Sequence, residues 1–193
     1  DAVLCFAECE TLHWGKRLLK FSGGFSRALL RTMRGSALRH RALTAMTPFQ
    51  TTAPTIALIG APTDIGAGAR GASMGPEALR VAGLQPALES HGLQVLDRGN
   101  LNGPPNPWLP PHDGYRHLAE VAAWNQLVFD AVHTELQAGH LPLLLGGDHC
   151  LGVGSIAAVA RHCFDTGKKL RVLWLDAHAD FNTRTLTPSG NLH

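Results

Sequence analysis

Short apolar runs alternate with longer stretches of helical periodicity along most of the chain. The apolar runs predict buried strands over residues 55–60, 94–97, 141–145 and 171–175. Between them, apolar residues spaced three or four apart predict helices over about 75–90, 114–137 and 154–162. Strands that alternate with helices favour a parallel sheet covered on both faces. We therefore expect an α/β fold with three layers, αβα, and a mostly parallel sheet.

The first 45 residues depart from this pattern. They hold 8 of the 17 Lys and Arg residues but only 3 acids, and residues 11–45 contain no acid at all. We interpret residues 1–45 as a basic extension outside the fold, with residues 46–193 forming the catalytic part. An Arg-rich targeting segment is the alternative interpretation.

Composition narrows the classes of function. The chain is 45% hydrophobic and 17% charged, which is typical of a globular protein, and its apolar runs are too short to span a membrane. Residues 46–193 hold nine basic and twelve acidic residues, so we expect no nucleic-acid partner. The four cysteines form no CxxC pair, which predicts free thiols in a reducing compartment, the cytoplasm.

Polar residues follow two of the predicted strands, where ligands bind in parallel α/β sheets. His149 follows one strand, and Asp176, His178 and Asp180 follow another. In extended backbone, alternate residues face the same way, so the last three should project together. Two carboxylates and an imidazole on one face need a cation among them. Oxygen-rich ligation with imidazole favours Mn²⁺, with Zn²⁺ and Fe²⁺ as alternatives. The four residues predict a metal site of a hydrolase.

Neutral hydrogen-bonding residues come next along the chain. Asn182, Ser189 and Asn191 are suited to holding a substrate carboxylate, although the same residue types also form ordinary turns. His193 is suited to moving protons near neutral pH.

From about residue 56 to residue 193 the chain resembles the ureohydrolase family, and within it the arginases most closely. The resemblance lies in residues 68–80 (GARGASMGPEALR), 146–149 (GGDH) and 176–182 (DAHADFN). The segment 189–193 (SGNLH) is similar to the arginase loop that binds the substrate α-carboxylate. Agmatine has no carboxylate, so its hydrolases have no need of that loop.

The resemblance implies a binuclear manganese hydrolase that cleaves L-arginine to L-ornithine and urea. It implies two Mn²⁺ ions, with Asp176 bridging them, and a homo-oligomer that is a trimer or hexamer. The residues that match metal ligands are His149, Asp176, His178 and Asp180. Those that match substrate contacts are Asn182, Ser189 and Asn191. Those that match catalytic groups are His193 and Asp180. Cys150 stands where arginases commonly have Ser, and we expect it to be a packing residue.

The resemblance also predicts how much of the family's catalytic domain this chain contains. The family's further Asp-x-Asp motif and Glu have no counterpart here, and neither do the strands that lie between the third and fourth predicted ones. We therefore expect an N-terminal fragment that lacks full activity and whose last two predicted strands do not pair with each other. The alternatives are an agmatinase or formimidoylglutamase, or a non-catalytic fragment that binds metal.

Overall fold

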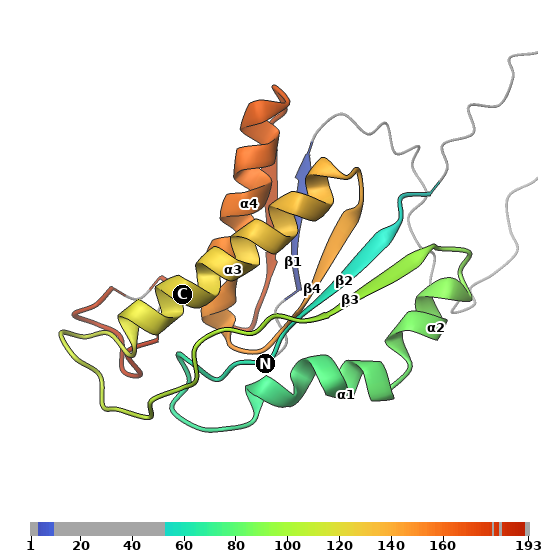
Figure 1. Cartoon of the computed structure of the whole chain (residues 1–193). Coiled ribbons are helices and arrows are strands. Elements are labelled where there is room, and N and C mark those ends of the chain that lie inside the picture. Colours follow the sequence, from blue (N-terminus) through green and yellow to red (C-terminus); the bar gives the residue numbers. More distant parts are fainter. Residues whose placement is uncertain (1–3, 10–52, 179, 182, 192–193) are drawn as a thin grey trace, which may run out of the picture. The chain divides into compact units, whose positions relative to one another are not determined.

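A computed structural model describes residues 4–9, 53–178, 180–181 and 183–191 (Figure 1). Its strands are β1 (Leu4–Cys9), β2 (Ile56–Ala61), β3 (Val95–Asn100), β4 (Leu141–Gly146) and β5 (Leu170–Leu175). Its helices are α1 (Gly75–Val81), α2 (Leu84–Glu89), α3 (Leu118–Gln137) and α4 (Gly152–Asp165), with 3₁₀ turns at Ala72–Met74 and His149–Leu151.

The central sheet has three parallel strands in the order β3-β2-β4. Every residue of the middle strand β2 is buried, because helices cover both faces of the sheet. Ile59 packs with α3 and α4, whereas Leu58 packs with α2. Figure 1 shows α3 and α4 on one side of the strands and α1 and α2 on the other. The predicted three-layer α/β fold with a parallel sheet is confirmed.

The helices predicted over residues 75–90 and 114–137 differ most from the structure. The single helix predicted over 75–90 is wrong, because Gly83 adopts a left-handed conformation (φ 83°) between α1 and α2. Pro86 then falls in the first turn of α2, where its missing N–H breaks no helical hydrogen bond. Helix α3 begins at Leu118, not near Gly114, because Gly114 and His117 both have positive φ angles. No helix in the described part of the chain is long and apolar enough to cross a membrane.

Strand β5 lies outside the parallel sheet. It pairs antiparallel with β1, with Leu4 opposite Leu175 and Cys9 opposite Leu170. Within the described residues β4 and β5 do not pair with each other, as expected from the sequence. The sequence pattern does not predict the pairing of residues 4–9 with β5, and residues 10–45 of the basic extension lie outside the described residues.

Candidate metal centre

The turn after β4 positions the first candidate ligand, His149. Gly147 has a φ of 143°, and a Cβ there would overlap the Ala61 carbonyl oxygen, so only glycine fits. The turn lets the Asp148 N–H donate to the Thr63 carbonyl at 2.9 Å. The Asp148 carboxylate in turn accepts the Cys150 N–H at 3.0 Å and caps the 3₁₀ turn that carries His149.

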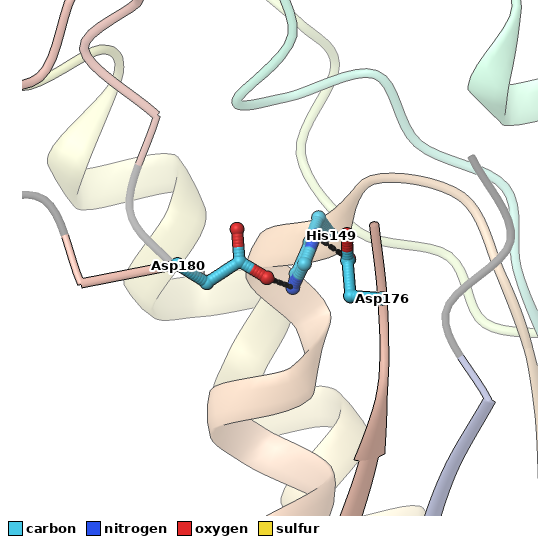
Figure 2. A group of neighbouring side chains, drawn as sticks. All are labelled: His149, Asp176 and Asp180. Atoms are coloured by element: carbon cyan, nitrogen blue, oxygen red, sulfur yellow. Dashed lines mark ion pairs between the residues drawn. The ribbon is translucent and has the colours of Figure 1, made fainter. Parts of the chain in front are cut away.

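Two carboxylates from the segment after β5 meet the His149 ring (Figure 2). His149 Nδ1 lies 3.6 Å from Asp176 Oδ2, and His149 Nε2 lies 3.4 Å from Asp180 Oδ2. One ligand atom from each of the three residues lies within 4.8 Å of the others. The two carboxylate side chains are only 4% and 7% exposed. Buried carboxylates at this spacing, with an imidazole between them, form a donor set that suits a divalent cation.

The backbone conformation that brings the two carboxylates together differs from the predicted one. The three polar residues were expected to project together from extended backbone, and this geometry is wrong. Strand β5 ends at Leu175, the chain bends at residues 177–178, and Asp180 has a left-handed φ of 51°. Aspartate is one of the few residues other than glycine that adopt this conformation readily. Asp180 therefore reaches His149 through a turn.

His178 lies beside this group of three without belonging to it. Its side chain is 66% exposed, and its Nδ1 is 3.1 Å from Asp176 Oδ1. Its backbone N–H also donates to Asp176 Oδ1 at 2.7 Å. This N–H lowers the pKa of the Asp176 carboxyl against the opposing effect of burial, and the His178 and His149 side chains lower it further. The assignment of His178 as a metal ligand stays a prediction.

The segment expected to hold a substrate carboxylate lies against the turn after β4. Asn191 donates from Nδ2 to Asp148 Oδ1 at 3.1 Å. The Arg116 guanidinium donates to the Ser189 carbonyl at 3.2 Å, and the Arg116 N–H donates to the Gly190 carbonyl at 2.8 Å. The structure thus places Ser189 and Asn191 on a loop fixed beside the candidate ligands. Asn182 and His193 lie outside the described residues.

Sequence reasoning missed two residues that support the site. Arg116 carries no sequence signal, because it acts through backbone carbonyls of a distant loop. Trp174 donates from its indole Nε1 to Asp180 Oδ2 at 2.9 Å, and its position two residues before Asp176 on one strand face is a signal that could have found it. Cys150 is fully buried, and burial, together with the Asp148 charge, raises the pKa of its thiol. This supports a packing role for Cys150.

Comparisons with known proteins bear on this site. A model of the arginase family matches residues 54–193. An arginase from Brevibacillus brevis is 41% identical over 142 residues, which are 72% of this chain and 45% of that protein. The arginase structure from Bacillus caldovelox matches with a TM-score of 0.62 at 35% identity, covering 72% of this chain and 46% of the other.

An Entamoeba histolytica arginase solved in complex with L-ornithine is also similar to the chain. It matches with a TM-score of 0.59 at 26% identity, covering 72% of this chain and 47% of the other. The chain thus spans about half the length of the relatives that it matches.

Proposed function

The chain belongs to the arginase family, and from this premise we propose that the cluster of His149, Asp176 and Asp180 is part of the metal centre of a ureohydrolase. The reaction that we propose is cleavage of the guanidinium group of L-arginine to L-ornithine and urea. The observation that carries the proposal is the convergence of a histidine and two carboxylates whose side chains are 4% and 7% exposed, with ligand atoms within 4.8 Å of one another.

The donor set fits manganese. Mn²⁺ prefers carboxylate oxygen ligands to thiolate sulfur, and this cluster supplies two carboxylates and an imidazole. Asp176 has one oxygen 3.6 Å from His149 and the other 3.1 Å from His178, an arrangement that supports a bridging role between two ions. Bound Mn²⁺ would lower the pKa of a water ligand, so that hydroxide is available near neutral pH. His149, Asp176, His178 and Asp180 would hold the ions, and Asp180 would also meet the departing amine.

The loop at residues 189–191 supports an amino-acid substrate. The Ser189 hydroxyl and the Asn191 amide are neutral groups suited to a carboxylate. Ser189 Oγ already accepts the Asn191 N–H at 3.2 Å, and Arg116 fixes the loop through the Ser189 carbonyl. A loop held in place before binding loses little conformational entropy when it takes up the ligand. We expect L-arginine to be preferred over agmatine, which lacks the carboxylate.

Calorimetric titration with Mn²⁺ tests the metal centre. We expect the chain to bind Mn²⁺ and His149→Ala to weaken binding by at least about 100-fold, since even residues that only support metal ligands contribute 10- to 100-fold. His112→Ala is the matched control, because His112 also lies near a carboxylate, 3.8 Å from Asp113, but its side chain is 93% exposed. Equal Mn²⁺ affinity in both variants would contradict the proposed site.

A substrate panel tests the reaction. We expect little urea release from these 193 residues with Mn²⁺, because only three donors gather among the described residues and the matched region covers only 45% of the Brevibacillus brevis arginase. Appreciable turnover would contradict that expectation. Binding of L-arginine should exceed binding of agmatine, and Ser189→Ala should reduce the difference. Tighter binding of agmatine or formimidoylglutamate would overturn the substrate assignment.

A further inference from the structure

The two halves of the candidate metal centre lie on strands that do not pair. His149 follows β4 in the parallel sheet, and Asp180 follows β5, which pairs with β1. No ladder of backbone hydrogen bonds therefore fixes the distance between these two side chains in the described part of the chain. A ligand set works only when its geometry is held closely, so other contacts must set this distance.

The Trp174 side chain touches both halves. The indole Nε1 of Trp174 donates to Asp180 Oδ2 at 2.9 Å. The Trp174 ring lies against the His149 ring, with centroids 5.0 Å apart at an angle of 35°. The same ring packs over the start of α4, where a Cβ on Gly152 would lie 3.3 Å from it. Trp174 therefore joins the segment after β5 to the turn after β4.

The indole is chemically suited to orienting a metal ligand. Its N–H is a donor only, and it carries no charge, so it can orient a carboxylate without repelling a nearby cation as Lys or Arg would. Asp180 also holds a left-handed backbone conformation, with φ of 51°, which is less favourable than the ordinary regions for a residue with a Cβ. A hydrogen bond to its carboxylate offsets part of that cost, because bonds to charged groups are among the stronger ones.

We propose that Trp174 is a positioning residue, which holds Asp180 and His149 in the arrangement that binds metal. The inference rests on the proposed metal centre and deepens it. Trp174 does not itself coordinate metal. Its N–H sets the orientation of the Asp180 carboxylate, and its ring sets the position of His149.

The first test uses the metal-free protein. In a ¹H–¹⁵N spectrum, Trp174→Phe identifies the indole resonance of Trp174 among those of the four tryptophans. We expect this resonance to lie away from the free-indole position and to move toward it in Asp180→Gly, which removes the acceptor but tolerates a positive φ. A resonance at the free-indole position, or one that Asp180→Gly leaves unchanged, would overturn the proposal.

The second test is Mn²⁺ affinity by calorimetry. Trp174→Phe keeps a ring against His149 and Gly152 but lacks the N–H, and we expect Mn²⁺ binding to weaken about 10- to 100-fold. Trp124→Phe is the matched control, because the Trp124 indole donates to the Pro104 carbonyl at 2.8 Å inside the core. It should lower the stability of the fold without changing the Kd for Mn²⁺.

The outcomes separate the two proposals. An unchanged Kd in Trp174→Phe, or an equal weakening in both variants, rejects the positioning role while leaving the metal centre in place. Failure of the wild-type chain to bind Mn²⁺ rejects the metal centre itself. In that case the indole spectrum alone decides whether Trp174 holds Asp180.

Discussion

His149 comes from a turn enclosed in the core, whereas Asp176 and Asp180 come from a segment with exposed surroundings. Around His149, Asp148, Cys150 and Leu151 are all buried, at most 5% exposed. On the other side, the apolar residues of β5 and the following segment are open to solvent, among them Val172, Leu173, Leu175 and Phe181. Two ligand-bearing segments of one site thus differ sharply in how well the rest of the chain supports them.

The difference indicates how the site is organised. The parallel sheet sets the geometry of the turn after β4, because the residues around His149 are fixed by packing and by a backbone hydrogen bond from Asp148 to Thr63. The parallel sheet does not hold the segment after β5. Its carboxylates are oriented by local hydrogen bonds from the Trp174 indole and the His178 backbone N–H. Changes near the first half should therefore alter folding, and changes near the second half should alter metal binding.

The largest expected effect on the free energy of unfolding comes from replacing a leucine by alanine in each half of the site. Leu151 is 2% exposed and Leu175 is 52% exposed. Leu151→Ala leaves a cavity and should lower the free energy of unfolding by about 2–5 kcal/mol. Leu175→Ala should lower it by less than about 1 kcal/mol, since surface substitutions have small effects. Urea denaturation measures both values, and equal losses would show that β5 is as well covered as the core.

The turn glycine gives the next largest effect. Gly147→Ala should lower the free energy of unfolding by about 3 kcal/mol, because φ is 143° and the new Cβ would meet the Ala61 carbonyl oxygen. Gly139→Ala is the control: its φ of 78° is also left-handed, but no atom lies within 4 Å of the added Cβ. It should cost only about 1–2 kcal/mol. Similar losses in thermal unfolding would remove the steric argument.

The sequence predicts the better supported half of the site more accurately than the other half. The apolar runs predict the strands, and the rule that ligands bind at strand ends correctly brings His149 near Asp176. These predictions succeed because burial on both faces of β2 leaves a continuous apolar run. The break between α1 and α2 is missed because apolar periodicity continues across it, although Gly83 and Pro86 both mark it in the sequence.

The other half depends on contacts that no local pattern encodes. The expectation that Asp180 projects in line with Asp176 assumes extended backbone, and a single left-handed residue invalidates it. The pairing of β1 with β5 joins residues at opposite ends of the chain, so no local periodicity indicates it. The support from Arg116 to the loop at residues 189–191 likewise arises only when distant segments meet.

Adding or removing Mn²⁺ should change hydrogen exchange in the segment after β5, which is the less supported half of the site. In the metal-free chain, the amide of His178 should exchange with solvent faster than that of Leu58 in the buried strand β2. Mn²⁺ at ten times its Kd should slow exchange near His178 about tenfold, equal to about 1.4 kcal/mol, and EDTA should reverse the change. Hydrogen exchange with mass spectrometry measures this. Slowing that persists in His149→Ala would show that Mn²⁺ acts elsewhere.

The smallest effect concerns an ion pair in the sheet half. Arg80 makes two contacts with Asp97, at 2.7 and 2.9 Å, which join α1 to β3. The Arg80 hydrogen bond lowers the pKa of Asp97 below its ordinary value of 3.8, against the opposing effect of burial. The stabilisation is therefore present above the unfolded-state pKa and is lost as the pH falls through the lower, folded-state pKa.

Asp97→Asn should therefore destabilise the chain in one pH range only. At pH 7 we expect a loss of about 1 kcal/mol, typical of a well-aligned surface pair. As the pH falls through the lowered, folded-state pKa of Asp97, the wild-type carboxyl becomes protonated, so the difference between the two proteins should shrink. Urea denaturation across this range measures the loss. The Kd for Mn²⁺ at pH 7 should not change, because this pair belongs to the sheet half, and a weaker Kd would show that the two halves are coupled.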